Sequence, residues 1–419
     1  MKHTTFSQYA IDNASILFLA QIRKDHTNTF RFSMTLTEAV CPDTLQMAVD
    51  RIYRRFPTVI AGFRPGFFHY FQVPAKTPPQ VQPDPGCLLT MHKEELCSCA
   101  YRVYYKENQV SIEAFHALTD GYGAIASFTT LIAEYLRLKQ GIQIPIKAPL
   151  VNLEHSPMLH ELEDSFLAYD NDKPARMPNR YAYQLPGNDV ARGNIKIASY
   201  VAPTQKILDT AHKYGVTINT LLSSLMAASV MEIQHNQQAE KLQPVRIMVP
   251  VNLRRIFPSQ TLRNFSYYTL PTMEPQDHNK PIHALFQSFA QQIQLQMQKD
   301  HMASIITNNV KLQNAWFFRI IPLFVKRALM RLICCFFGER TSSVTVTNLG
   351  NVTLPEEMSR YITHMDVMLT PRIRSPYGCA VLSYNGSLSI NISRFPQQSE
   401  LETIFFRKLD SLLYGEAIL

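Results

Sequence analysis

The chain has 419 residues, of which 46% are apolar and 18% charged, so it can form a globular protein of two or three domains with an ample core. Its formal net charge is +8, but the cations are spread along the sequence without a long basic run or a recognisable module, which argues against nucleic acid as a partner. Seven cysteines without a C-x-x-C pair argue against a zinc site and a disulfide framework.

The N-terminal stretch MKHTTFSQYAIDNASILFLAQIRK contains only one short apolar run, ILFLA. It lacks the longer apolar core of a secretory signal. No stretch approaches 18 uncharged apolar residues, so no helix is expected to span a bilayer. Together with the cysteine pattern, this predicts a reduced, cytoplasmic protein.

The first third of the chain predicts several short strands and one well-marked helix. Apolar residues recur at helical spacing from Leu45 to Tyr53, between a start signal at Pro42 and a stop at Pro57. Strands are expected at 30–36, 67–73, 101–105 and 110–115, with a proline-rich connector at 74–85. The last two strands are close enough to form a hairpin.

The hexapeptide HALTDG follows the expected strand at 110–115 and leads into a helical pattern that starts at Gly121. A histidine at a strand end, here His116, is well placed to accept a proton at neutral pH. Its alternative is a structural histidine bonded to a backbone carbonyl. Asp120 is a candidate helix cap or a partner for an arginine, with Arg254 as the best candidate, and Gly121 allows a tight bend.

Other catalytic patterns are missing from the sequence. There is no G-x-S-x-G elbow, no P-loop and no H-E-x-x-H motif. The 14 glycines form no dinucleotide fingerprint, and His155 and His160 have no matching ligand set. We therefore expect neither a metal nor a permanently bound cofactor.

A polar stretch that includes DNDKPARMPNR is the best candidate for a linker between two halves. It divides the chain into a first domain at 1–170, a linker at 171–194 and a second domain at 195–419. In the second half, strands are expected at 195–201, 245–253 and 342–350, a buried helix at 215–233, a hairpin at 378–393 closed by Asn385-Gly386, and a helix at 398–413. Strands and helices mix without regular alternation, which predicts an α/β fold with mixed sheets in two halves.

The segment at 314–337 combines many apolar residues with four cations, Arg319, Lys326, Arg327 and Arg331. On a helical wheel these cations fall within an arc of roughly 140°, although Pro322 should start or kink a helix. One interpretation is that this segment makes peripheral contact with a membrane surface or forms an apolar entrance to a substrate site. The other is a helix packed on the core with a solvated face.

Several segments, in chain order, resemble the chloramphenicol acetyltransferase-like acyltransferases, a superfamily that includes condensation domains of peptide synthetases and alcohol acetyltransferases. HALTDG resembles their H-x-x-x-D-G motif, VPVNLRR with the later Asn264-Phe265 pair resembles a strand of the second half, and VTVTNLG resembles a late strand ending in S/T-N-x-G. The nearest subgroup is the bacterial alcohol acetyltransferase-like proteins. Many members carry two consecutive histidines, whereas Phe115 precedes His116 here.

The resemblance implies two similar subdomains, arranged as a pseudo-dimer, with a tunnel between them. It implies that His116 is the general base that moves an acyl group, foremost acetyl, from acyl-CoA as co-substrate to the hydroxyl of an alcohol or lipid acceptor. Asp120 would be a structural residue of the motif paired with Arg254, and Thr347 or Asn348 would stabilise an oxyanion or contact substrate. Phe128, Tyr267, Tyr268, Trp316 and Phe317 are candidates for lining an apolar acceptor site, and core packing is their alternative.

Two other functions stay open at this point. One keeps the chemistry but takes the acyl group from an acyl-carrier protein, onto an amine. The other is a non-catalytic binding protein of the same fold, against which the intact HALTDG motif argues. Because two halves of one chain can complete the site, a monomer is expected.

Overall fold

The sequence folds into a two-lobed α/β structure, seen in a computed structural model that describes residues 7–169, 181–187, 195–237, 242–334, 339–395 and 399–415. In the first half the strands are β1 (Tyr9–Ala10), β2 (Thr29–Leu36), β3 (Ala61–Pro65), β4 (Tyr70–Pro74), β5 (Val81–Pro83), β6 (Tyr101–Lys106) and β7 (Gln109–Phe115). Its helices are α1 (Asn13–Ala20), α2 (Pro42–Ile52), α3 (Lys93–Ser98), α4 (Gly121–Gln140) and α5 (Leu159–Leu162).

The second half alternates long helices with strands. Its strands are β8 (Lys196–Pro203), β9 (Val245–Asn252), β10 (Ser266–Thr269), β11 (Thr272–Met273), β12 (Val344–Val352), β13 (Ile362–Leu369), β14 (Tyr377–Tyr384) and β15 (Ser387–Arg394). Its helices are α6 (Thr204–Lys213), α7 (Ile218–Asn236), α8 (Ile282–Gln296), α9 (Lys299–Asn314), α10 (Trp316–Ile320), α11 (Leu323–Ile333), α12 (Glu356–Ser359) and α13 (Glu400–Tyr414).

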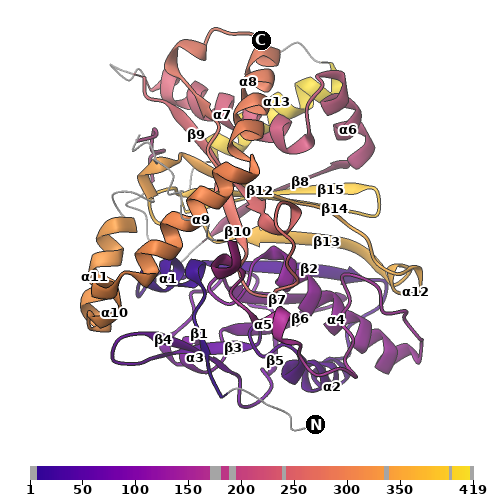
Figure 1. Ribbon diagram of the computed structural model, residues 1–419. Coiled ribbons are helices and arrows are strands. Elements are labelled where there is room, and N and C mark those ends of the chain that lie inside the picture. Colours follow the sequence, from indigo (N-terminus) through magenta and orange to yellow (C-terminus); the bar gives the residue numbers. More distant parts are fainter. Residues whose placement is uncertain are drawn as a thin grey trace.

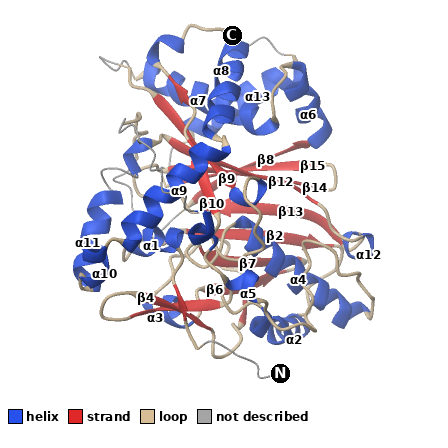
Figure 2. Ribbon diagram, in the orientation of Figure 1, coloured by secondary structure: helices blue, strands red, loops and turns tan. Residues whose placement is uncertain are grey.

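Two large mixed sheets lie in the middle of the molecule, with helices at its two ends (Figure 1, Figure 2). The first sheet has the order β13-β2-β7-β6-β5, and α2 and α4 cover it. The second has the order β10-β9-β12-β14-β15-β8, with β11 also paired to β9, and α6, α7, α8 and α13 lie at its end of the molecule. The predicted mixed α/β class and two-lobed arrangement are therefore confirmed.

One strand of the second half completes the sheet of the first. β13 pairs antiparallel with β2, with Val367 opposite Phe32, although 335 residues separate the two positions in the chain. It also contacts β15 through side chains, since Asn391 Nδ2 donates to the backbone carbonyl of Val367 at 3.0 Å. The lobes are thus joined by backbone pairing. A strand that follows the predicted linker at 171–194 in the chain belongs to the sheet of the half that precedes this linker. Of that linker, residues 181–187 form neither helix nor strand, and the rest lies outside the described residues.

Each lobe has its own apolar core. The predicted helix near Leu45 is α2, with Leu45, Ala48, Val49 and Ile52 fully buried and Pro42 at its first turn. The second-half helix α7 carries apolar and small residues around most of its surface, because it is enclosed between β9 and α13.

Two sequence predictions fail locally. The apolar run at 67–73 is not one strand: β4 starts at Tyr70, and Phe67 to His69 form the turn of the β3–β4 hairpin, where Gly66 N donates to His69 O at 2.7 Å. The stretch at 74–85 is not only a connector, because β5 pairs parallel with β6. Pairing of edge strands depends on distant partners, which local periodicity does not reveal.

The segment at 314–337 forms two short helices, α10 and α11, with Pro322 capping the second as its position predicted. Residues 335–338 lie outside the described part of the chain. Among the described helices, none is by itself long and apolar enough for a bilayer span; α6 and α7 reach that length and composition only as a pair bent by 80°.

Candidate active site

His116 directly follows the end of β7, the third strand of the first sheet. Its backbone N–H donates to Asn28 O at 2.8 Å, and Leu118 N donates to Phe115 O at 2.9 Å, so the chain leaves the strand in a tight turn. β7 is flanked by β2 and β6 along its length. The histidine is therefore carried by a rigid sheet, and its position does not depend on a mobile loop.

The imidazole ring is held between aromatic side chains. It stacks on Phe18 of α1 with 4.3 Å between ring centroids and meets the edge of Phe30 at 5.1 Å. Nδ1 is fully buried and makes no hydrogen bond with the described residues, which leaves Nε2 as the ring nitrogen accessible from the adjoining cavity.

Burial lowers the pKa of His116 below its ordinary value, because a buried imidazolium loses hydration. Its own backbone carbonyl, the Asp120 carboxylate and the Asn264 side chain act in the opposite direction without cancelling that effect. The ring is consequently neutral at physiological pH. A neutral imidazole with one accessible nitrogen is suited to accept a proton.

Asp120 is committed to structural contacts. Oδ2 accepts from Arg254 Nη1 at 2.7 Å and from the backbone N–H of Phe265 at 2.8 Å. Oδ1 accepts from the N–H groups of Tyr122 and Gly123 at the start of α4, at 3.1 and 3.4 Å. Asp120 thus caps α4 and binds the second half, as both alternatives for this residue predicted, and none of its hydrogen bonds goes to His116.

The guanidinium of Arg254 is equally engaged. Besides Asp120 it donates to the carbonyl oxygens of Thr261 and Arg263, at 2.8 and 2.7 Å from Nη2. Both members of the ion pair have side chains only 6% exposed. The pair fixes the HALTDG loop against the segment at 261–265.

Two glycines allow this close approach. A Cβ on Gly123 would lie 2.1 Å from the backbone oxygen of Leu262, and a Cβ on Gly121 would lie 2.6 Å from Cδ2 of Leu349. No other residue type fits at Gly123 without moving backbone.

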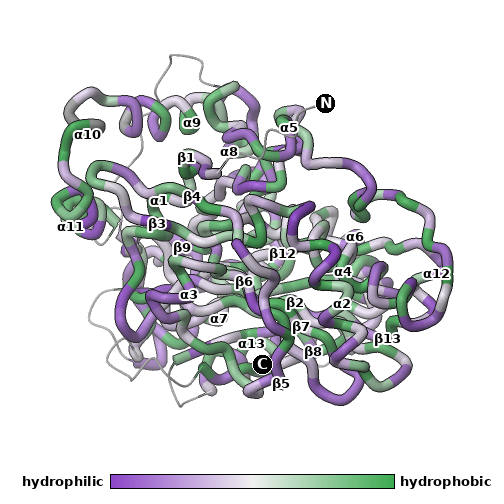
Figure 3. Tube along the Cα trace, turned by 90° about the horizontal axis from the view of Figure 1, so that it is seen from below, coloured by the Kyte–Doolittle hydropathy of each residue, from purple (hydrophilic) through white to green (hydrophobic). Residues whose placement is uncertain are grey.

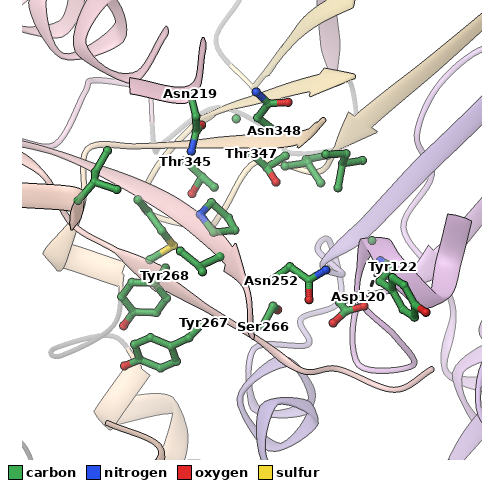
Figure 4. A pocket seen from close by; sticks show the side chains of 18 of the residues that line it. Asp120, Tyr122, Asn219, Asn252, Ser266, Tyr267, Tyr268, Thr345, Thr347 and Asn348 are labelled. Atoms are coloured by element: carbon green, nitrogen blue, oxygen red, sulfur yellow. Dashed lines mark hydrogen bonds between the residues drawn. The ribbon is translucent and has the colours of Figure 1, made fainter. Parts of the chain in front are cut away.

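A cavity of about 1590 Å³ opens beside His116 and is lined by residues of both halves. Figure 4 shows Asp120 and Tyr122 from the first half, Asn252, Ser266, Tyr267 and Tyr268 from β9 and β10, and Thr345, Thr347 and Asn348 from β12 around this space. Its walls are mainly apolar, with contributions from α1, α8 and the end of α11. His116, Asp120, Gly121, Thr347 and Asn348 all border it, whereas Arg254 lies behind Asp120.

The β12 wall contains a local break in strand pairing. β12 pairs with β14 in register up to Asn348, the register then shifts before Asn351, and Gly350 has φ of 78°. Asn348 Oδ1 accepts from Gly350 N at 2.8 Å. Such bulges are common at the rims of sites, and Thr347 and Asn348, which precede this break, both line the cavity.

Of the aromatic candidates, Tyr267 and Tyr268 line the cavity and stack on each other at 4.5 Å. Phe128 does not: it is fully buried in the core of the first lobe, because α4 packs against the sheet through this face. Trp316 lies on the surface, and the side chain of Phe317 lies outside the described residues.

A buried polar cluster next to the site was not predicted. Asp12, at the start of α1, lies with Oδ2 3.5 Å from Arg263 Nε, and Asp164 accepts from Asn13 N at 3.1 Å. Burial raises the pKa of Asp12, and burial together with the Asp12 carboxylate raises the pKa of Asp164 to about 7. Asn264 joins the cluster to the catalytic loop, since its Nδ2 donates to Ala117 O at 3.3 Å. The Asn264-Phe265 pair was the only signal of this cluster in the sequence.

No cluster of three or more His, Cys, Asp or Glu side chains suited to a metal ion occurs in the described part of the chain. The cavity combines His116 with polar groups on β12 and large apolar walls, and His212 of α6 also borders it.

No family model matches the sequence, and no curated protein matches it significantly. Solved structures do match the fold. Polyketide synthase associated protein 5 from Mycobacterium tuberculosis superposes with a TM-score of 0.62 at 13% identity, covering 98% of each chain. A wax ester synthase/diacylglycerol acyltransferase from Marinobacter aquaeolei gives 0.53 at 13% identity, covering 97% of this chain and 99% of that one.

A starter condensation domain of rhizomide synthetase gives a TM-score of 0.55 at 13% identity, covering 97% of this chain and 95% of that one. At such identities the likeness concerns the fold alone. The chain has the two-lobed fold of the condensation domains and chloramphenicol acetyltransferase-like acyltransferases.

Proposed function

We propose that the protein transfers an acyl group from a coenzyme A thioester to the hydroxyl of an apolar acceptor, with His116 as the general base. The observation that carries the proposal is a neutral imidazole whose accessible nitrogen faces a large apolar cavity between two lobes. The reaction class is suggested by proteins that share this fold. They are a polyketide synthase associated protein, a wax ester synthase and a condensation domain of rhizomide synthetase.

In the proposed reaction, Nε2 of His116 takes the proton of the acceptor hydroxyl while that oxygen attacks the thioester carbonyl carbon. The tetrahedral intermediate then expels the thiolate, which receives the proton back from Nε2, so that the products are an ester and free thiol. A positioned base contributes typically about 10²–10⁴-fold. The lowered pKa keeps the ring neutral, which is the form this step requires.

The intermediate carries a negative oxygen that needs preorganised hydrogen-bond donors. Thr347 and Asn348 supply a hydroxyl and an amide at the cavity wall on β12, and Thr345 adds a buried hydroxyl that has no hydrogen-bond partner among the described residues. We assign the oxyanion contact to this strand. No metal is needed, because a thioester is already an activated acyl donor.

The cavity's composition supports the assignment of substrate class. Its walls include Leu17, Ile125 and Met297, which favour an apolar acceptor, and the wax ester synthase named above acts within the same fold. Arg255 is exposed at the cavity and offers a cation to the phosphates of coenzyme A.

The experiment is a thiol-release assay on the purified full chain. Acetyl-CoA and longer acyl-CoA thioesters are combined with a panel of alcohols and amines of increasing chain length, and ester or amide formation is verified by mass spectrometry. We expect alcohols to be acylated and His116→Ala to lose activity by about two to four orders of magnitude. His235→Ala, which changes an exposed histidine of α7, is the matched control.

Turnover with an acyl-carrier protein but not with acyl-CoA, or with amines but not alcohols, would replace this proposal by carrier-dependent condensation. Unchanged activity in folded His116→Ala would remove the base assignment. Thioester binding without turnover of any acceptor would favour a non-catalytic binding protein.

A further inference from the structure

A surface patch that does not include His116 combines exposed aromatic side chains with cations that pair with no carboxylate among the described residues. It is formed by α10, α11 and the turn of the β3–β4 hairpin, and we call it the α11 patch. Its exposed apolar side chains are Phe67, Phe68, Trp316, Ile320, Phe324, Val325, Leu329 and Leu332. Trp316, Phe324 and Phe67 are 74%, 73% and 72% exposed, which is unusual for large aromatic side chains.

The helix and the hairpin turn are fastened to each other. Leu323 N donates to Phe67 O at 2.8 Å, and Lys326 Nζ donates to Phe68 O at 2.9 Å. Helix α11 lies at the edge of the molecule in two perpendicular views (Figure 1, Figure 3). The exposed aromatic rings therefore sit on a fixed framework.

Helix α11 turns its apolar face outward. At about 100° per residue, Phe324, Val325, Ala328, Leu329 and Leu332 fall within one arc of roughly 140°, and all five are exposed. Its inward arc contains Leu323 and Met330 but also Lys326, which is only 5% exposed. The sequence alternative of a core-packed helix with a solvated cationic face does not describe this arrangement.

Three cations border the outward arc or lie beneath it. Lys326 contacts the Phe68 carbonyl, His69 and the ring of Phe318, and Arg331 contacts the carbonyls of Ala20 and Ile22. Arg327 Nε is buried and has no hydrogen-bond partner among the described residues. No carboxylate among the described residues pairs with any of the three.

A second cavity of about 250 Å³ lies under this helix, lined by His69, Tyr70, Lys326 and Arg327. Burial lowers the pKa of Arg331, and the nearby cations Arg327 and Arg23 lower it further. An anion placed here would relieve that repulsion and satisfy Arg327 Nε. Cations beside exposed aromatic rings match a surface that is negative at its headgroups and apolar below them.

We propose that the α11 patch docks the protein on a membrane surface containing anionic phospholipid, with Arg327 and Arg331 facing lipid phosphates and the aromatic side chains entering the interface. α11 ends in Ile333 and Cys334, which line the cavity next to His116, and α1 lies between the patch and that cavity. An apolar acceptor dissolved in a bilayer would therefore reach the site beside the docking face. This last consequence rests on the proposed function; membrane docking does not.

The chain's single tryptophan, Trp316, lies in the patch, so its fluorescence reports docking directly. The purified full chain is titrated with vesicles of phosphatidylcholine alone and of phosphatidylcholine mixed with phosphatidylglycerol, and binding is measured independently by flotation. We expect a blue shift and flotation with the mixed vesicles only, and quenching by lipids brominated on the upper acyl chain.

Two variants dissect the patch. Phe324→Ser with Leu332→Ser should lower the partition coefficient roughly tenfold or more, because two exposed apolar groups no longer leave water. Arg327→Gln with Arg331→Gln should remove the preference for the anionic vesicles. Val201→Ser with Leu295→Ser, which changes exposed apolar residues of β8 and α8, is the matched control and should bind as wild type.

Absence of vesicle binding by the wild type, or equal binding by the patch and control variants, would overturn the proposal. The proposal would also be overturned if the wild type bound an acidic acyl-carrier protein but no vesicles, and if the patch variants lost that binding. The partner of the patch would then be a protein. Thiol release from soluble substrates is measured in parallel. If the patch variants lose vesicle binding but keep turnover, membrane docking and the proposed acyl transfer are tested separately.

Discussion

Asp120 and Arg254 lie 134 positions apart in the chain, yet the carboxylate oxygen of one is 2.7 Å from the guanidinium nitrogen of the other. Because both side chains are almost fully buried, removal of either leaves an uncompensated charge. We expect Asp120→Ala and Arg254→Ala each to lower the free energy of unfolding by about 3–5 kcal/mol. The double variant should lose clearly less than the sum, which urea denaturation of all four proteins would measure. Additive losses would mean that the pair does not act as a unit.

The two glycines of the same loop should respond differently to alanine. At Gly123 the new methyl group meets backbone oxygen at 2.1 Å, so we expect a loss of about 1–3 kcal/mol or more. At Gly121 it meets only the end of Leu349, which can rotate, so stability should change by less than about 1 kcal/mol. Since Leu349 lines the cavity, Gly121→Ala should instead change KM. Thermal unfolding and steady-state kinetics on the two variants would test the contrast, and equal destabilisation would contradict it.

The parts of this site that are local in the chain could be predicted from the sequence. HALTDG stands between an alternating strand and a helical pattern, and β7, the turn at His116 and α4 follow in that order. Arg254 could be predicted as the partner of Asp120 because it lies at the end of a strand with clear period-two alternation. The register break after Asn348 was not visible in the sequence, although the family resemblance singled out Thr347 and Asn348.

The remainder depends on contacts between distant positions. Asp12, Asp164 and Arg263 meet only through the tertiary fold, and each residue type by itself is typical of a surface. β13 joins β2 across most of the chain, which no local pattern specifies. The run FFHYFQV at 67–73 predicts a strand, but a turn places Phe67 and Phe68 on the surface, where α11 adds its own outward apolar face.

The stacking of Phe18 on His116 predicts a measurable pH effect. Burial holds the pKa of His116 below its ordinary value of 6.5, so activity should be constant across neutral pH and fall only in acid, as the base becomes protonated. Phe18→Ala admits water to the ring and should raise this pKa, which moves the acid limb of kcat/KM to higher pH. Phe18→Leu keeps the site dry and should leave the limb in place. Titration of the histidine ring protons by NMR would follow the same shift without substrate.

Asp164 predicts a pH dependence of stability rather than of activity. Its pKa is raised to about 7 in the folded chain from 3.8, so between these values the folded state binds more protons than the unfolded state. This contribution to stability is present below pH ~4 and is lost as pH rises through ~7. Asp164→Asn should therefore flatten the decline in stability between pH 5 and 8, measured by urea denaturation at a series of pH values. Asp209→Asn, at an exposed position of α6, serves as the control, and an unchanged slope in Asp164→Asn would contradict the assignment.

The assignment of the oxyanion to β12 predicts a specific kinetic signature. A donor that contacts the oxygen only when it becomes negative stabilises the transition state and not the bound substrate. Thr347→Val and Asn348→Ala should therefore lower kcat, with the responsible residue costing about 10²-fold or more, while KM changes little. Thr347→Ser, which keeps the hydroxyl, should retain activity if Thr347 is the donor. A change confined to KM in both variants would show that these residues bind substrate in its ground state, and the oxyanion would then have to be stabilised by a different wall of the cavity.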